Sequence, residues 1–330
     1  MTGIVIAGVA HSHVDYALAE IGARDELHLL GVHDTDAESA ARVADATGAP
    51  AFDSLDDLLA LKPSIVACAG VYSERADIVT AALDAGADVL CDKPLCISLE
   101  ELDRIDSAMQ RTGRHVALML EKRTYPETIA LSDALRDGSL GRPVAFASWA
   151  PHKLLRDQRA AWFLDPASYG GILSDLLVHD IDIALQITGA EHGTVRGWLG
   201  PAIDTGFHLQ GGATVVFGDE TGPRLSAEVD WLTPAGSAIH GDYRMRVVGT
   251  AGTAELYWGR GEIELTTTEQ PRQTHRYGVG RRPAEDALDA LLAGGEAAAL
   301  AAREAVLVSR IALLAEQSAR SGGIELDWRA

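Results

Sequence analysis

Three polar residues recur at helical spacing inside an otherwise apolar segment. Asp175, His179 and Asp182 are four and three positions apart, and most residues between them are leucine, valine or isoleucine. On a helix this spacing places the three side chains on one face. Buried polar groups need compensation, and an imidazole beside a carboxylate is suited to proton transfer near neutral pH. The segment predicts a general acid–base pair, with a metal site on the same face as an alternative.

A second candidate is the turn Asp92-Lys93-Pro94, which directly follows a predicted buried strand. Lysine is scarce in this chain, because only 4 of the 28 basic residues are lysines. The carboxyl ends of strands in open α/β sheets are where ligands bind. An ammonium group held there by a proline-containing turn can donate to a substrate hydroxyl or carbonyl. The alternative is a surface Asp–Lys pair of small energetic weight.

The loop Gly8–His13 overlays a dinucleotide-binding fingerprint, with Gly8, Ala10 and His13 at its three glycine positions. Only the first glycine is retained, but a predicted strand precedes the loop and a predicted helix follows it. That arrangement directs free backbone N–H groups at a phosphate. Asp34, at the end of the next strand, can hold ribose hydroxyls and disfavours a 2′-phosphate, which favours NAD over NADP. Alternatively, Gly8 forms only a tight turn and Asp34 caps a helix.

The same loop supports two other functional hypotheses. His11 and His13 have the spacing that places two imidazoles on one metal in barrel-type hydrolases, and Asp175 and His179 could complete such a site. Residues 194–266 do not continue the βα alternation of an eight-fold barrel, which argues against this metal-dependent hydrolase or isomerase. The reduced glycine fingerprint also leaves open a non-catalytic, nucleotide-binding regulatory protein.

A locally basic loop lies at residues 151–162 in a strongly acidic chain, which has 48 acidic and 28 basic residues and a net charge of −20. His152, Lys153 and Arg156 could contact a polar or anionic substrate, and Trp162 could form an apolar wall. A solvated charged loop explains the pattern equally well. The net charge argues against nucleic acid and anionic membrane surfaces as partners.

The predicted elements change character near residue 122. Residues 1–122 alternate short apolar strands with helices, which predicts βαβ units and a doubly wound parallel sheet. Residues 123–330 contain successive strands between 194 and 267 without intervening helices, which predicts an α+β domain with an open, mostly antiparallel sheet. No apolar run is long enough to span a membrane. The absence of a signal peptide and the three unpatterned cysteines predict a reducing, cytoplasmic location.

Taken together, these residues resemble the Gfo/Idh/MocA family of glucose–fructose oxidoreductase, inositol dehydrogenase and MocA-type proteins. The lysine turn of that family is Glu-Lys-Pro, and here it is Asp92-Lys93-Pro94. A second motif, Gly-Gly…Asp-x-x-x-His-x-x-Asp, is matched by residues 170–182. The chain departs from the family at residues 70–75, where Gly-Val-Tyr-Ser-Glu-Arg replaces a frequent Thr-Pro-Asn-x-x-His.

The resemblance implies a Rossmann domain followed by an α/β domain, and nicotinamide-dependent oxidation or reduction at a hydroxyl or carbonyl of a sugar, cyclitol or related polyol. It implies that Lys93 bonds the reacting hydroxyl and the cofactor, that His179 is the general base, and that Asp175 positions substrate or lysine. The cofactor is expected to be NAD, with NADP as the alternative, and no metal is expected. The cofactor-binding residues expected on this basis are Gly8, Ala10, His11, Ser12, His13, Asp34, Gly70, Tyr72, Asp92, Lys93 and Pro94. The expected substrate-binding residues are Arg123, His152, Lys153, Arg156, Trp162 and Asp175.

The resemblance also implies a homodimer or homotetramer. An open sheet with one apolar face often needs a partner. The predicted strands of this sheet contain Trp198, Trp231 and Trp258.

Overall fold

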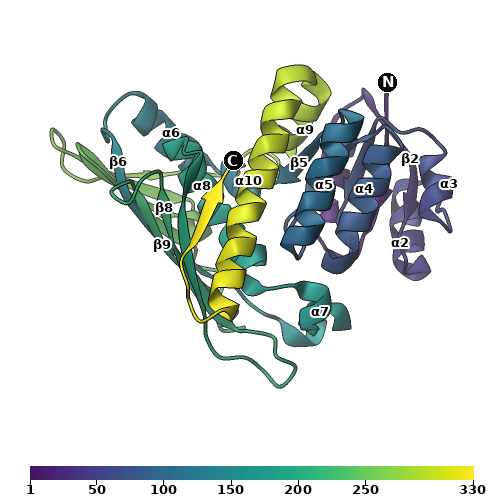
Figure 1. Ribbon diagram of the computed structural model, residues 1–330. Helices are drawn as coiled ribbons and strands as arrows, with labels where there is room; N and C mark the ends of the chain where they lie inside the picture. Colours follow the sequence, from purple (N-terminus) through teal and green to yellow (C-terminus); the bar gives the residue numbers. More distant parts are fainter. The chain divides into compact units, whose positions relative to one another are not determined.

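The computed structural model describes residues 1–330, which form two compact units (Figure 1). The first unit comprises Met1–Glu121, Ala167–Gly170 and Arg282–Ser309, and the second comprises Lys122–Pro166, Gly171–Arg281 and Arg310–Ala330. A single division between residues 122 and 123 therefore leaves out the later segments by which the chain returns to the first unit.

The first unit is built on a five-stranded parallel sheet with strand order β2-β1-β3-β4-β5. Its strands are β1 (Thr2–Ala7), β2 (Leu27–His33), β3 (Ile65–Cys68), β4 (Asp88–Asp92) and β5 (Val116–Met119). The apolar runs of β3 and β5 are buried along their whole length, as expected for strands covered on both faces. The chain winds outward from β1 in two directions, so the ends of β1 and β3 form the switch point at which such sheets bind ligands.

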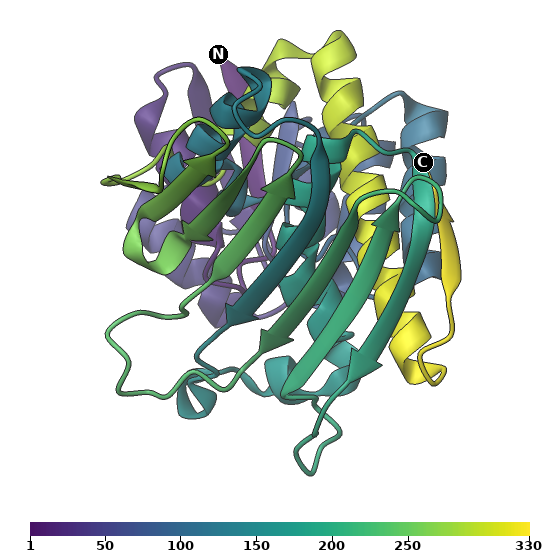
Figure 2. The ribbon, with the colours of Figure 1, turned by 90° about the vertical axis from the view of Figure 1, so that its left-hand side faces the viewer.

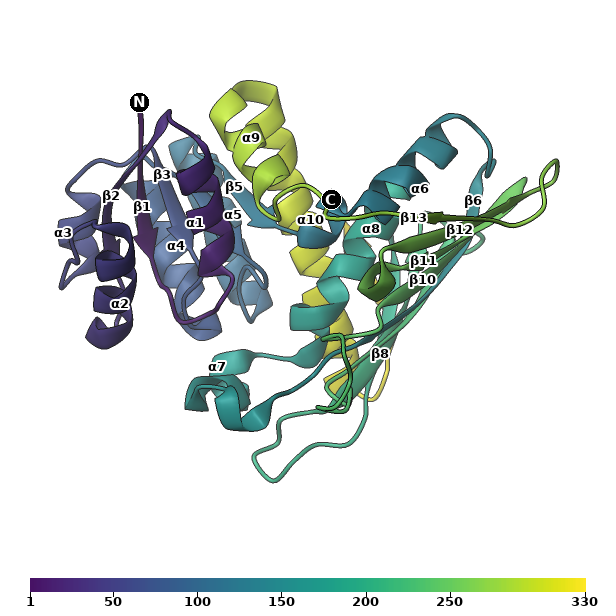
Figure 3. The same cartoon turned by 180° about the vertical axis from the view of Figure 1, so that it is seen from behind.

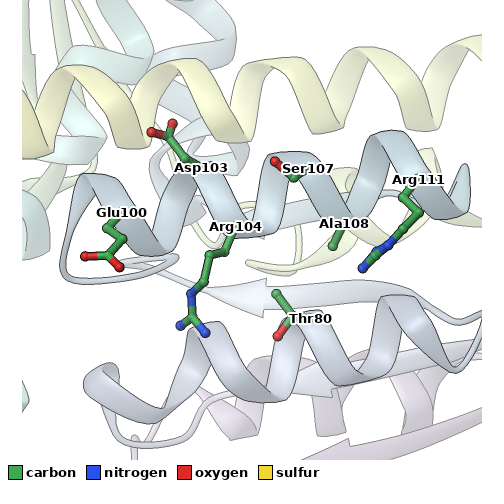
Figure 4. A pocket seen from close by; sticks show the side chains of 7 residues that line it. All are labelled: Thr80, Glu100, Asp103, Arg104, Ser107, Ala108 and Arg111. Carbon is green, nitrogen blue, oxygen red and sulfur yellow. The ribbon is translucent and has the colours of Figure 1, made fainter.

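Helices cover both faces of this sheet (Figure 3). They are α1 (Val14–Ala23), α2 (Ala37–Thr47), α3 (Leu55–Leu59), α4 (Arg75–Asp84), α5 (Leu99–Thr112) and α9 (Glu285–Ala293). Helices α4 and α5 contact each other, while α9 contacts β4 and β5. Leu288 and Ala298 share an apolar core with Ile4, Ile6 and Leu90, which explains why the segment near α9 belongs to the first unit.

The second unit contains a nine-stranded sheet with strand order β13-β12-β11-β10-β6-β9-β8-β7-β14. Its strands are β6 (Pro143–Pro151), β7 (His192–Leu199), β8 (Gln210–Phe217), β9 (Arg224–Asp230), β10 (Arg244–Gly249), β11 (Gly252–Tyr257), β12 (Glu262–Thr267), β13 (Gln273–Arg276) and β14 (Leu326–Arg329). Only β6 and β9 pair in parallel. The predicted α/β fold, with a parallel sheet and a second, mostly antiparallel sheet, is therefore confirmed.

Helices cover one face of this second sheet, and its other face is open (Figure 2). The helices of the second unit are α6 (Pro126–Arg136), α8 (Val178–Thr188) and the C-terminal part of α10 (Gly295–Arg320). The short helix α7 (Pro166–Tyr169) and the N-terminal part of α10 belong mostly to the first unit. Strand β9 shows the resulting alternation, because Leu225, Ala227 and Val229 are buried while the residues between them are exposed.

Two sequence predictions need correction here. The segment that carries Asp175, His179 and Asp182 is not one continuous α-helix, because Leu173–Leu177 forms a π-helix that leads into α8. Trp231 and Trp258 lie just beyond β9 and β11 and are buried, so they do not belong to the open face; Trp149 and Trp198 are 51% and 40% exposed. None of the helices has the length and apolar character needed to cross a membrane.

Candidate functional site

The loops after β1 and β3 meet at the switch point of the first sheet. Gly8 has φ +90°, and a Cβ there would lie 2.6 Å from the Cα of Gly70, so this position requires glycine. The N–H of Ala69 donates to the Gly8 carbonyl (3.0 Å), and the N–H of His11 donates to the Ala69 carbonyl (2.8 Å). The retained glycine of the fingerprint therefore permits a close approach of two backbones.

Asp34 fixes the start of the same loop. Its buried carboxylate accepts the N–H of Val9 (2.6 Å) and, through its other oxygen, the N–H of Asp36 just before α2 (2.8 Å). The amides of Ala10 and Ser12 make no hydrogen bond within the protein. A glycine turn, free amides before α1 and a carboxylate at the end of β2 fit a dinucleotide, with the amides at its phosphates and Asp34 at its ribose.

A hydrogen-bonded network surrounds the carboxylate of Asp92, which ends β4. His13 Nδ1 lies 2.8 Å from Oδ1, while His11 Nδ1 and Arg75 Nη2 lie 3.0 and 2.9 Å from Oδ2. Because a carboxylate only accepts, each imidazole carries its Nδ1 proton toward Asp92. Asp92 is fully buried and Lys93 is 5% exposed, so the hypothesis of a surface ion pair is wrong.

Burial and the neighbouring charges set the protonation of this network. Burial would raise the pKa of the Asp92 carboxyl, but His13, Arg75 and His11 outweigh it and hold that pKa well below its usual range. Burial, helped by repulsion from His13 and Lys93, lowers the pKa of His11 to about 3 against the attraction of Asp92. His11 is therefore neutral at physiological pH, and Arg75 is the cation that balances Asp92.

His11, His13 and Asp92 also have the spacing of a metal site, since their ligand atoms lie within 4.8 Å of one another. Arg75 already bonds the carboxylate that a metal would need, and the contacts from the imidazoles have hydrogen-bond lengths. The arrangement therefore fits a hydrogen-bonded network better than a metal centre. The predicted metal set also contains Asp175 and His179, which belong to the second unit.

Aromatic rings pack around this network. Tyr72 is fully buried, and Arg75 lies over its ring with the guanidinium carbon 4.3 Å from the centroid. Tyr72 stacks on Tyr169, with centroids 5.7 Å apart, and His13 stacks on Tyr16 at 4.3 Å. These contacts fix the loops after β1 and β3. Most of the predicted cofactor-binding residues lie on these two loops, and the others are Asp34 and the turn Asp92-Lys93-Pro94.

In the second unit, Asp175 lies on the π-helix and His179 on the first turn of α8, and both are buried. π-Helical turns occur often at functional sites. Glu316 of α10 accepts the N–H of Leu173 (3.2 Å), and a Cβ on Gly171 would lie 2.2 Å from its carboxyl carbon. The second glycine of the Gly-Gly motif therefore makes room for a carboxylate that supports this helix.

Two ion pairs anchor α8. Asp182 receives both Nε (2.7 Å) and Nη2 (2.5 Å) of Arg123, so these two predicted site residues bond each other. Lys122 Nζ donates to the fully buried Asp180 (2.6 Å), which also accepts the hydroxyl of Ser148 (3.0 Å). Lys122 and Asp180 were not predicted, although each is adjacent to a residue that was.

The basic loop lines one side of a groove of about 460 Å³ in the second unit. The lining residues are Lys153, Leu154, Leu155, Arg156, Asp157, Gln158, Trp231, Leu232, Thr233 and Ala235. The aromatic wall is Trp231, whereas Trp162 packs against Phe163. His152 does not line the groove; its ring centroid lies 4.5 Å from that of Tyr243 and 5.3 Å from that of Trp231.

Comparison with known families agrees with this architecture. Residues 2–120 match the profile of the oxidoreductase family with an NAD-binding Rossmann fold, and residues 128–255 match the GFO/IDH/MocA C-terminal domain. The chain belongs to the Gfo/Idh/MocA family. The predicted family and the predicted NAD-binding domain are thus confirmed, and the family match does not favour the hydrolase or the regulatory protein.

Several relatives have named activities. UDP-N-acetylglucosamine 3-dehydrogenase of Acidithiobacillus ferrooxidans is 32% identical over 170 residues, which cover 51% of this chain and 49% of the relative. scyllo-Inositol 2-dehydrogenase (NAD(+)) of Bacillus subtilis is 28% identical over 189 residues, covering 55% and 51%. The chain therefore spans about half the length of these curated relatives. Levoglucosan dehydrogenase, solved with NADH and levoglucosan, shares the fold, with a TM-score of 0.81, 18% identity and 99% coverage of both chains.

Proposed function

We propose that this oxidoreductase is an NAD-dependent dehydrogenase that acts on a hydroxyl or carbonyl of a sugar, cyclitol or related polyol, with NADP as the alternative cofactor. The observation that carries the proposal is the buried Lys93, on the turn after β4, in an NAD-binding Rossmann domain whose switch point is shaped for a dinucleotide. Lysine is seldom buried in proteins, because moving a charged group out of water is costly. The named activities of the relatives point to the same class of substrate.

When bound, the nicotinamide exchanges a hydride with the carbon that bears the reacting oxygen. We assign Lys93 Nζ to that oxygen, where a donor stabilises the charge that develops as the proton leaves. The His179 imidazole takes the hydroxyl proton during oxidation and returns it during reduction. The Asp175 carboxylate orients the substrate or the Lys93 ammonium.

The preference for NAD rests on Asp34. Its carboxylate lies at the end of β2, where it favours ribose hydroxyls and repels a 2′-phosphate. The phosphates are assigned to the loop Gly8–His13 and its free amides. The lysine turn and the loop that contains Gly70 and Tyr72 complete the proposed cofactor contacts.

The groove beside the basic loop is the proposed substrate-recognition surface of the second unit. Lys153 and Arg156 provide positive charge for polar or anionic groups, and Trp231 provides an apolar wall. Arg123 contributes indirectly, because its bond to Asp182 holds the helix that carries His179. We further propose a homodimer or homotetramer formed through the open sheet face that exposes Trp149 and Trp198, which light scattering tests, and a cytoplasmic location, which cell fractionation tests.

The test is a spectrophotometric screen for reduction of NAD and NADP over sugars, inositols and sugar acids. We expect turnover with at least one polyol, faster with NAD. Lys93→Met and His179→Asn should lose turnover while NADH still binds, as measured by fluorescence. Lys62→Met, at an exposed lysine, is the matched control and should keep full turnover. Full turnover in either site variant would exclude the assigned role.

A further inference from the structure

We propose that Arg75 is the residue that positions Lys93, by holding the backbone on both sides of it. The proposal rests on the proposed role of Lys93. Arg75 is the first residue of α4, which follows β3, whereas Lys93 lies on the turn after β4. The Arg75 side chain is fully buried. It belongs neither to the predicted catalytic residues nor to the predicted binding residues.

The guanidinium makes four hydrogen bonds, which together span two loops. Nη1 donates to the carbonyl of Asp92 (2.9 Å) and to the carbonyl of Pro94 (2.8 Å), the residues before and after Lys93. Nη2 donates to the Asp92 carboxylate (2.9 Å), and Nε donates to the carbonyl of Gly70 (3.0 Å). The planar guanidinium fixes these directions relative to one another, which an ammonium group cannot do.

The hydrogen bonds from Arg75 satisfy buried backbone carbonyls of the turn that carries Lys93. Asp92, the last residue of β4, and Pro94 are both buried, and a buried carbonyl requires a donor. Arg75 satisfies both, and its ring contact with Tyr72 fixes the guanidinium plane. The backbone of Lys93 is therefore tied to β3 and α4, so the origin of its side chain is set by a rigid part of the sheet edge.

The pair also explains two departures from the family pattern. Arg75 occupies the position of the family's histidine in Thr-Pro-Asn-x-x-His, and Asp92 that of the glutamate in Glu-Lys-Pro. The structure shows that these two positions bond each other. The shorter acid is thus matched by a longer base, so the two changes compensate across one contact.

The test uses the scarcity of lysine. Labelling the protein with ¹³Cε-lysine gives four side-chain signals, and Lys93→Arg assigns that of Lys93. We expect Arg75→Met to shift the Lys93 signal and its pH titration, while the signals of the other three lysines stay at their wild-type positions. On a polyol identified by the cofactor screen, we expect roughly a tenfold loss in kcat, part of the 10²–10⁴-fold that a proton-transfer group contributes, without a change in KM for NAD.

Arg24→Met is the matched control, because Arg24 lies in the same unit but bonds Glu20 (2.9 Å) and Asp289 (2.7 Å) on α1 and α9. It should leave the Lys93 signal unchanged. If Arg75→Met does not fold, the same measurements are made on Arg75→Lys. This variant keeps the positive charge, but its ammonium group cannot reach all four oxygens that the Arg75 guanidinium bonds. A folded Arg75 variant with a wild-type Lys93 signal and titration overturns the proposal. A shifted signal in a protein that oxidises no polyol would instead overturn only the proposed function.

Discussion

The neutral, buried His11 makes a prediction that the structure allows us to quantify. The pKa of His11 is lowered to about 3 in the folded protein, against a value near 6.5 for an exposed histidine. Between these values the unfolded chain binds a proton that the folded chain does not. The contribution of His11 to stability is therefore fully present above about pH 6.5 and is lost as the pH falls toward the folded pKa.

The size of the effect follows from the shift. Each pH unit below the unfolded pKa costs about 1.4 kcal/mol, so lowering the pH from about 7.5 to about 5 should cost roughly 2 kcal/mol from His11 alone. His11→Asn removes this titrating group. We expect the free energy of unfolding of the variant to fall by roughly 2 kcal/mol less than that of the wild type over the same interval.

The assay must report on the first unit. All six tryptophans lie in the second unit, so tryptophan fluorescence does not follow the first. Hydrogen exchange of peptides from β1 and β3, corrected for the intrinsic rate at each pH, measures the stability of the sheet beside His11. The control is His28→Asn, at an exposed histidine on β2, which should lose stability between the two pH values as the wild type does. An equal loss in His11→Asn and wild type would refute the reasoning.

Three further predictions concern the contacts that hold the site. Asp92→Asn should lower the free energy of unfolding by about 3 kcal/mol at neutral pH, because Arg75 loses its buried counterion. Urea unfolding at several pH values should show the difference from wild type shrinking only as the pH falls from about 4 toward the depressed folded pKa of Asp92. Lys122→Met leaves Asp180 buried without its cation, so it should lower the free energy of unfolding by about 3–5 kcal/mol, measured by thermal unfolding. Ser148→Ala removes only a hydroxyl donor to Asp180 and should lower it by about 1 kcal/mol, and equal effects would contradict the assigned ion pair. Gly171→Ala places a methyl group against the Glu316 carboxylate and should lower the free energy of unfolding by about 1–3 kcal/mol. Gly22→Ala, in α1, has open space around the added Cβ and should leave the stability unchanged or raise it. Equal shifts of the two melting temperatures would contradict this prediction.

The local sequence was enough to predict where Lys93 and Gly8 lie in the fold. Lys93 was placed at a sheet edge because a buried strand ends just before it, and Gly8 at a tight turn because a strand and a helix flank it. Both inferences need only the alternation of apolar and polar residues along a short stretch. The fold class followed in the same way, from the change of pattern near residue 122.

The contacts that support these segments could not be predicted in this way. Arg75 acts mainly on backbone carbonyls, which every residue carries and which leave no mark in the sequence. The amide of Leu173, in the π-helix at Leu173–Leu177, donates to Glu316, which is 143 residues away in the sequence. Strand β13 is short and exposed along its whole length, so it has no apolar alternation to reveal it.

The central claim is hydride transfer to NAD that depends on Lys93. It is tested most directly with a polyol deuterated at the reacting carbon, by measuring deuterium in the reduced cofactor with mass spectrometry. The account predicts that the wild-type protein forms deuterated NADH, and that Lys93→Met forms it about 10²–10⁴-fold more slowly while binding NADH with unchanged affinity. Transfer by Lys93→Met at the wild-type rate, or NADH binding by the wild type without any transfer from the whole polyol panel, would contradict it.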